Sequence, residues 1–294
     1  MPGAVGVVGL GAIGGSLARV LAGSGYEVVG YDVNADVTKG AAAFVTPAGS
    51  AAEASAGAAL VLVAVFDDDQ VRDVLAGEGS ILAADDPCRV VAVLSTVTLD
   101  TIVWANEQAA ARGVAVLDCG VTGGPGLRDH GKVVVFAGGD EAVLETVRPI
   151  LATFAAPLLY MGPSGAGMKA KLARNVIHYG TWFAAWEGAR LAAACGLDVS
   201  KLVQGVRTSD EWTGGTMALL ADYRIGPGPV DPNDASTLET ARRLASFAHK
   251  DLRAALELSA QVGIGLPGAA LDEEVYDAVV GVGPFDGDGS RVIA

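Results

Sequence analysis

The stretch Gly9-Leu10-Gly11-Ala12-Ile13-Gly14 decides the fold, because it places a G-x-G-x-x-G pattern between a short apolar strand and a helix. The strand ends in Gly6-Val7-Val8-Gly9, and residues 16–24 follow with apolar residues at helical spacing. In this pattern the first glycine permits a tight turn, the second lets the backbone approach a pyrophosphate, and the third lets helix and strand pack closely. The free N–H groups of the helix N-terminus then face the phosphates. The pattern predicts a dinucleotide site at Gly9, Leu10, Gly11, Ala12, Ile13 and Gly14; a simple tight turn is the alternative.

Asp32 indicates which dinucleotide is bound. It follows the apolar run Glu27-Val28-Val29-Gly30-Tyr31 and comes 18 residues after Gly14. A carboxylate at this point accepts hydrogen bonds from the ribose hydroxyls of NAD and repels the 2′-phosphate of NADP. The next residues, Val33 and Asn34, offer no arginine for that phosphate. We therefore expect NAD, with NADP less favoured; a solvated turn carboxylate is the alternative reading of Asp32.

The rest of the first half alternates apolar runs with helix-like stretches. Further apolar runs occupy residues 58–66, 89–94, 114–117 and 132–137. Continuous apolar strands alternating with helices are typical of a parallel sheet that is covered on both faces. We expect an α/β fold, a Rossmann-type doubly wound and mostly parallel sheet, over residues 1–162.

The character of the sequence changes at Gly165. Residues 168–195 are rich in alanine, contain no proline and end at Gly196, which is a good helix stop. Helical patterns follow at residues 200–208, 237–262 and 267–280. We expect an all-helical domain over residues 163–294, linked to the first domain by a long interdomain helix.

Composition excludes several classes of protein. Twenty Lys and Arg against 34 Asp and Glu give a net charge of −14, which disfavours nucleic acid and anionic membranes as partners. No apolar run reaches the roughly 18 residues of a membrane helix, and the N-terminus lacks the basic start of a secretory signal. Three widely spaced cysteines favour reduced thiols in a cytoplasmic protein. No Cys/His cluster has metal-ligand spacing, so a metal site is not expected.

Four motifs resemble the β-hydroxyacid dehydrogenase family, which includes 3-hydroxyisobutyrate dehydrogenase, and the likeness extends over nearly the whole chain. The motifs occur in the family's order: Gly9 to Gly14 with Ser16-Leu17-Ala18; Asp118-Cys119-Gly120-Val121-Thr122-Gly123-Gly124; Gly165-Ala166-Gly167-Met168-Lys169-Ala170-Lys171 with Asn175; and Lys250-Asp251-Leu252 with Gly263 and Pro267. The resemblance implies a dehydrogenase that assembles as a homodimer or homotetramer.

The resemblance places the catalytic lysine at Lys171. Asn175 follows by four residues and shares its helix face, whereas Lys169 points about 200° away around the helix. Lys171 would exchange a proton with the substrate oxygen while hydride passes between the substrate and the nicotinamide. We expect burial beside a positive nicotinamide to lower its pKa. An ordinary surface lysine is the alternative, and Asn175 either contacts the substrate, orients Lys171 or has no role.

Other site residues also come from the resemblance. Thr122-Gly123-Gly124 would bind the substrate carboxylate through backbone N–H groups and a hydroxyl; a plain glycine turn is the alternative. Val65 and Phe66, where the family usually has Leu-Pro, would contact the cofactor, as would Thr96. Lys250 would reach the cofactor side of the cleft, and a surface pair with the adjacent aspartate is the alternative.

Two arginines depart from the family pattern. Arg174 stands where asparagine is frequent, and Arg243 stands where phenylalanine is frequent, seven residues before Lys250. We expect Arg243 to contact the substrate, by binding a second carboxylate or a polar tail. We also expect Trp182 and Trp186 to pack against the second domain or a partner subunit.

The sequence thus predicts an NAD-dependent oxidoreductase that interconverts a small 3-hydroxy acid and its semialdehyde or keto acid. Two alternatives stay open. One is an imine reductase-like NAD(P)H enzyme, a related group that usually replaces the catalytic lysine with Asp or Tyr. The other is a non-catalytic NAD-binding scaffold or sensor.

Overall fold

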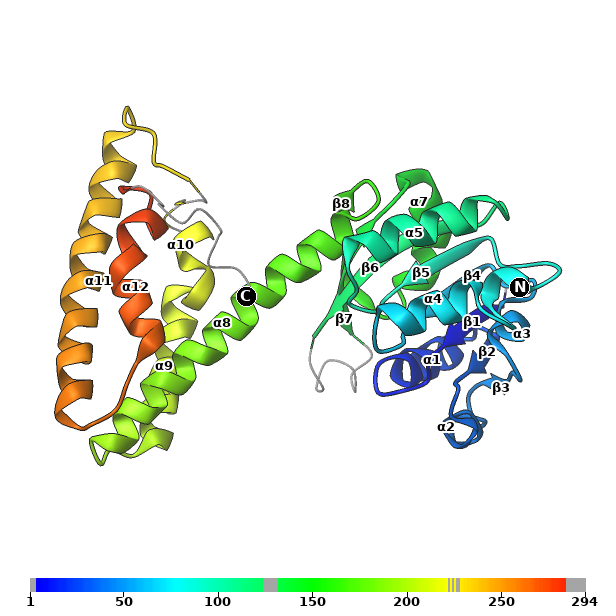
Figure 1. Ribbon diagram of the computed structural model, residues 1–294, viewed down its shortest axis with the longest axis horizontal. Coiled ribbons are helices and arrows are strands. Elements are labelled where there is room, and N and C mark those ends of the chain that lie inside the picture. Colours follow the sequence, from blue (N-terminus) through cyan, green and yellow to red (C-terminus); the bar gives the residue numbers. More distant parts are fainter. Residues whose placement is uncertain (1–3, 124–131, 222, 224, 226–227, 284–294) are drawn as a thin grey trace. The chain divides into compact units, whose positions relative to one another are not determined.

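The computed structural model describes residues 4–123, 132–221, 223, 225 and 228–283 (Figure 1). The chain separates into two compact units, Met1–Val176 and Ile177–Ala294, and each is described by itself. The division falls within one long helix, α8 (Ala166–Ala194). The domain boundary at residue 162 stays a prediction from the sequence.

A single eight-stranded sheet forms the first unit, in the order β3-β2-β1-β4-β5-β6-β7-β8. The strands are β1 (Val5–Val8), β2 (Val28–Tyr31), β3 (Thr46–Pro47), β4 (Leu60–Val63), β5 (Val90–Val93), β6 (Ala115–Thr122), β7 (Val133–Gly138) and β8 (Ala155–Gly162). All neighbouring strands pair in parallel except β6 and β7. The predicted mostly parallel sheet is therefore confirmed.

The antiparallel pair has a simple cause. Only residues 123–132 connect β6 to β7, and a parallel return needs a crossover of about a dozen residues or more. The apolar runs do not predict β8, because most of its side chains are exposed or half-buried at the edge of the sheet.

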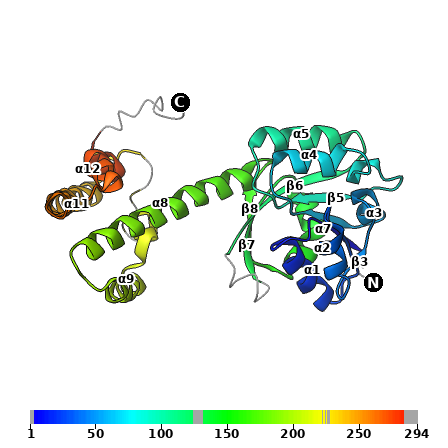
Figure 2. The ribbon, with the colours of Figure 1, turned by 60° about the horizontal axis from the view of Figure 1, so that its bottom comes forward.

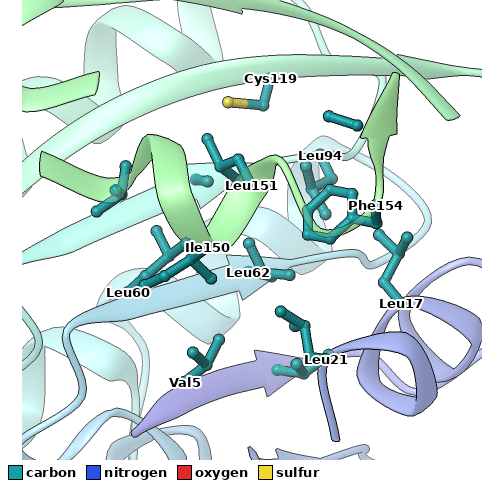
Figure 3. Close-up of a cluster of buried hydrophobic side chains, with 14 of the residues drawn as sticks. Val5, Leu17, Leu21, Leu60, Leu62, Leu94, Cys119, Ile150, Leu151 and Phe154 are labelled. Atoms are coloured by element: carbon teal, nitrogen blue, oxygen red, sulfur yellow. The ribbon is translucent and has the colours of Figure 1, made fainter. Parts of the chain in front are cut away.

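Helices cover both faces of this sheet, as Figure 2 shows. They are α1 (Gly14–Gly23), α2 (Ala35–Gly40), α3 (Ala51–Ser55), α4 (Asp68–Ala76), α5 (Leu99–Ala110), α7 (Glu141–Leu151) and the start of α8. Along β4, Leu60 and Leu62 face a core formed with α1 and α7 (Figure 3), whereas Val61 and Val63 face a second core formed with α3, α4 and α5. This alternation explains why the central strands read as continuous apolar runs.

The described part of the second unit is helical, as predicted. It holds the end of α8, α9 (Val199–Thr213), α10 (Ala218–Ala221), α11 (Ala235–Gln261) and α12 (Pro267–Val279). Helices α11 and α12 lie side by side in both ribbon views (Figures 1 and 2) and pack over a small core of Ile225, Ala241, Ala245 and Val280. Within the described residues, no helix combines the length and the hydropathy that crossing a bilayer requires.

Candidate active site

The glycine loop joins β1 to α1 as the sequence predicts. A Cβ on Gly14 would collide with the carbonyl oxygen of Gly9, so the helix can start this close to the strand only with glycine at that position. No atom of the described residues lies within 4 Å of the position that a Cβ on Gly11 would take. The loop therefore leaves open space where its backbone can meet a diphosphate.

A cavity of about 690 Å³ opens beside this loop. It lies past the carboxyl ends of β1 and β4, which are paired so that Val8 stands level with Val63. This is the point where the strand order reverses, and ligands of doubly wound sheets bind there. The cavity is lined by Val8, Gly9, Gly11, Ala12, Ile13, Tyr31, Asp32, Val33, Ala51, Ala64, Val65, Phe66, Gln70, Asp73, Val74, Glu78, Gly79 and Ser80.

Asp32 is tied to the glycine loop by its own carboxylate. Its Oδ2 accepts a hydrogen bond from the backbone N–H of Leu10 at 2.8 Å, and its Oδ1 accepts one from the N–H of Asn34 at 2.9 Å. A carboxylate offers about four acceptor sites, so two remain for the ribose hydroxyls of a dinucleotide. Leu10 itself takes part through this N–H, because its side chain is buried in the core.

The cavity has an acidic lining that the motifs did not reveal. Besides Asp32 it presents Asp73 and Glu78, and none of the described residues that line it is Lys or Arg. Asp73 belongs to α4, and Glu78 lies just beyond the end of that helix. Only the fold brings these residues to the glycine loop, so no local pattern could have singled them out.

Of the predicted cofactor residues that follow β4 and β5, two line the cavity and one does not. Val65 and Phe66 line the cavity, and the carbonyl of Val65 accepts a hydrogen bond from Ser95 Oγ at 2.8 Å. Phe66 is 85% exposed. Thr96 is exposed past the end of β5 and is not among the residues that line the cavity.

Asp118 fastens the start of α8 to β6. Its buried carboxylate accepts hydrogen bonds from the backbone N–H of Gly165 (2.8 Å, Oδ1) and of Met168 (2.7 Å, Oδ2). Burial raises the pKa of Asp118, and these N–H donors act in the opposite direction. Two residues along β6, a Cβ on Gly120 would collide with Cβ of Lys171. The motif segment from Asp118 to Thr122 is thus a strand that packs directly on the helix carrying the predicted catalytic residues.

Lys171 is held in an unusual setting for a lysine. It is 8% exposed, and burial, followed by the nearby charge of Arg174, lowers its pKa. Asn175 lies one helical turn further on the same helix, half-buried, and its Oδ1 is 3.4 Å from Nη1 of Arg174. Lys169 is exposed, as the helix geometry predicts.

Thr122 lies two residues after Gly120 on β6. Side chains two residues apart in a strand share one face, so Asp118, Gly120 and Thr122 all point toward α8. Thr122 ends β6, two residues beyond the point where the strand meets Lys171. Gly123 follows directly, and Gly124 lies outside the described residues.

Arg243 and Lys250 belong to the second unit. Both are exposed on α11, and their spacing of seven residues puts them on one face of that helix. Lys250 Nζ lies 3.3 Å from Oδ1 of Asp251 and 5.8 Å from the ring centroid of Phe247. Their roles toward substrate and cofactor remain predictions.

The first unit thus has the fold and the phosphate-facing loop of a dinucleotide-dependent oxidoreductase, and NAD(P) fits its glycine loop, open cavity and ribose-facing Asp32. Within the described residues, no group of three or more His, Cys, Asp or Glu side chains is placed to hold a metal ion.

Comparison with known proteins identifies the family. A family model described as the NAD binding domain of 6-phosphogluconate dehydrogenase matches residues 4–162, and one described as NAD-binding of NADP-dependent 3-hydroxyisobutyrate dehydrogenase matches residues 165–294. The chain belongs to the β-hydroxyacid dehydrogenase family. It is an NAD(P)-dependent dehydrogenase that acts on a CH–OH group.

Individual relatives agree with this assignment. The chain is 33% identical to an uncharacterized oxidoreductase of Mycobacterium tuberculosis, over 95% of this chain and 93% of the relative. It is 28% identical to an NAD-dependent L-serine dehydrogenase of Pseudomonas aeruginosa, over 97% and 95% of the two chains. A crystal structure of an oxidoreductase from Mycobacterium avium superposes with a TM-score of 0.83 at 31% identity, covering 95% of this chain and 99% of that one.

Proposed function

We propose that this enzyme interconverts a small 3-hydroxy acid and its semialdehyde or keto acid, using NAD, with Lys171 as the general base in oxidation and the general acid in reduction. The observation that carries the proposal is a buried lysine of lowered pKa, which shares a helix face with Asn175 beside the end of β6. A lysine with an ordinary pKa of about 10.4 is almost fully charged at neutral pH and is a poor base there. Burial and the charge of Arg174 favour the neutral form.

Lys171 Nζ would accept the proton of the substrate hydroxyl as the C–O bond becomes a carbonyl. NAD, when held at the glycine loop and Asp32, would supply the acceptor for the hydride that leaves the substrate carbon. In the reverse direction protonated Lys171 would donate to the carbonyl oxygen. Asn175 would hold the same oxygen or orient Lys171, and the Thr122 hydroxyl with the N–H of Gly123 would bind the substrate carboxylate.

We further propose NAD as the preferred cofactor over NADP. The support is electrostatic, because Asp32, Asp73 and Glu78 line the cavity without a facing cation among the described residues. A 2′-phosphate would carry about two further negative charges into this lining. The NAD dependence of the L-serine dehydrogenase relative agrees with this preference.

The oligomer and the compartment are also proposals. Along the part of α8 that belongs to the second unit, Tyr179, Trp182 and Trp186 are each more than half exposed, which supports burial of this face by a second copy in a homodimer or homotetramer. Cys88, Cys119 and Cys195 are free thiols, which supports a reducing, cytoplasmic setting.

The direct test follows absorbance at 340 nm for each candidate substrate with NAD(H) and NADP(H). The panel contains 3-hydroxyisobutyrate, L-serine, tartronate semialdehyde, glyoxylate, succinic semialdehyde, a dicarboxylic hydroxy acid and a cyclic imine. We expect turnover of at least one of them, faster with NAD(H). Turnover of a cyclic imine alone would establish the imine reductase alternative. NAD binding by calorimetry without turnover of any compound, the diacid and the imine included, would overturn the proposed activity and support the non-catalytic alternative.

A further inference from the structure

Arg174 stands beside the proposed catalytic lysine and has no acidic partner among the residues that the structure describes. Arg174 is half-buried on α8, three residues after Lys171. Its Nη1 donates a long hydrogen bond of 3.4 Å to Oδ1 of Asn175. Across the described parts of the chain, no carboxylate lies within ion-pair distance of either Arg174 or Lys171.

Among the described arginines, only Arg148 (2.7 Å from Glu145) and Arg253 (2.6 Å from Glu273) form an ion pair with a carboxylate. What distinguishes Arg174 is its position on α8, three residues after the buried Lys171. Two cations one helical turn apart repel each other, and burial of Lys171 increases that repulsion because solvent screens it less. A negative group supplied by a ligand would relieve it.

In the proposed function, other residues already bind the reacting oxygen and the first carboxylate of the substrate. The reacting oxygen lies with Lys171 and Asn175, and the first carboxylate lies with Thr122 and Gly123, so Arg174 remains. Its planar guanidinium presents paired N–H donors that match a carboxylate in geometry and charge. A phosphate would gain from the free N–H groups of a helix start, but those of Gly165 and Met168 at the start of α8 are bonded to Asp118. A carboxylate is the better fit.

We propose that Arg174 binds a second carboxylate of the substrate, so that this dehydrogenase acts on a 3-hydroxy acid that carries two carboxylates. The inference rests on the proposed function, because it places the reacting hydroxyl at Lys171. It assigns to Arg174 the contact that the sequence pattern suggested for Arg243.

The test compares two substrates that differ by one carboxylate. In 2-(hydroxymethyl)succinate, the methyl group of 3-hydroxyisobutyrate is replaced by a carboxymethyl group. We expect wild-type kcat/KM to be at least tenfold higher for the diacid. In Arg174→Gln we expect the diacid-to-monoacid ratio of kcat/KM to fall at least tenfold, and Arg174→Lys should recover part of it. Lys169→Gln removes one charge from the exposed side of the same helix and should leave the ratio within twofold of wild type.

Binding separates this inference from the proposed function. Methylsuccinate has both carboxylates but no hydroxyl, and isobutyrate is its monoacid counterpart. Calorimetry with NADH-loaded enzyme should show methylsuccinate binding at least tenfold more tightly, with the advantage lost in Arg174→Gln. If methylsuccinate binds more tightly through Arg174 but the enzyme turns over no substrate, the proposed function would be wrong. The carboxylate site at Arg174 would still be supported. Two outcomes would overturn the role of Arg174. One is turnover of the monoacid with no preference for the diacid. The other is a preference for the diacid that Arg243→Gln abolishes and Arg174→Gln keeps.

Discussion

At the scale of single residues, Asp32 has two separate roles. Its carboxylate fixes the glycine loop through the N–H of Leu10, and its charge faces the cavity together with Asp73 and Glu78. The first task affects either cofactor, whereas the second penalises only the one with the additional phosphate. Removing Asp32 should therefore weaken NAD binding while improving the relative use of NADP.

We predict that Asp32→Ala lowers the NAD-to-NADP ratio of kcat/KM at least tenfold, which corresponds to about 1.4 kcal/mol of discrimination. Asp36→Ala is the matched control, because Asp36 is an exposed carboxylate on α2 that pairs with Lys39. Initial rates at 340 nm with both cofactors provide the measurement. An unchanged ratio in Asp32→Ala would show that this carboxylate does not discriminate between them.

The pH dependence of the reaction should reflect the environment of Lys171. A general base must be neutral, so kcat/KM for oxidation should rise with pH and level off above the pKa of Lys171. Burial and Arg174 lower that pKa, so the midpoint should lie below the ordinary lysine value of about 10.4. Arg174→Gln removes the second cause and should move the midpoint to higher pH. A midpoint that stays unchanged in this variant would contradict the coupling between the two residues.

At the level of elements, the contact between β6 and α8 sets the geometry of the site. Asp118 holds the first turn of the helix, and Gly120 lets the next turn approach the strand until it meets Lys171. Both residues act on the same helix that carries Lys171 and Asn175. The spacing of strand and helix should therefore affect catalysis more than cofactor binding.

We predict that Gly120→Ala lowers kcat at least tenfold, because its methyl group would collide with Cβ of Lys171 and displace α8, and displacements of about 1 Å can cost about 10²-fold in rate. NAD affinity should change less than threefold. Gly23→Ala is the control, since nothing lies within 4 Å of its Cβ position at the end of α1. Full activity in Gly120→Ala would show that this close contact does not position Lys171.

The elements themselves were predictable where burial is uniform. Strands β1, β4 and β5 are buried along their whole length, so their apolar runs appear in the sequence. By contrast, β3 has two exposed residues and β8 is an edge strand of mixed exposure. Such strands form because a neighbour offers free backbone groups, and that information lies in the tertiary structure.

For the whole molecule, a feature could be predicted from the sequence when the residues that form it are close together along the chain. The glycine loop is a local pattern, and the sequence predicted its position between strand and helix. The positions of Asp73 and Glu78 in the cavity, and the contact of Gly120 with Lys171, depend on how distant segments pack. Motif spacing alone could not show that Arg174 has no acidic partner within the described part of the chain, because side-chain pairing is decided by the fold.

The aromatic face of α8 gives a prediction about assembly. Trp182 is 60% exposed in the single chain, and burial of a large aromatic side chain contributes about 2–3 kcal/mol. We predict that Trp182→Glu shifts the sedimentation equilibrium of the proposed homodimer toward monomer by at least tenfold in dissociation constant. Val103→Glu, an exposed apolar position on α5 of the first unit, should leave it unchanged. A wild-type protein that sediments as a monomer would refute the assembly.

The most direct test of the central claim compares Lys171→Met with Lys169→Met on the same helix. Initial rates at 340 nm are measured for the substrate found in the screen, and calorimetry reports NAD affinity in parallel. We predict that Lys171→Met lowers kcat at least ~10²-fold with NAD affinity within threefold of wild type, while Lys169→Met retains wild-type kcat. Retention of wild-type kcat in Lys171→Met would contradict the assignment of Lys171 as the general base.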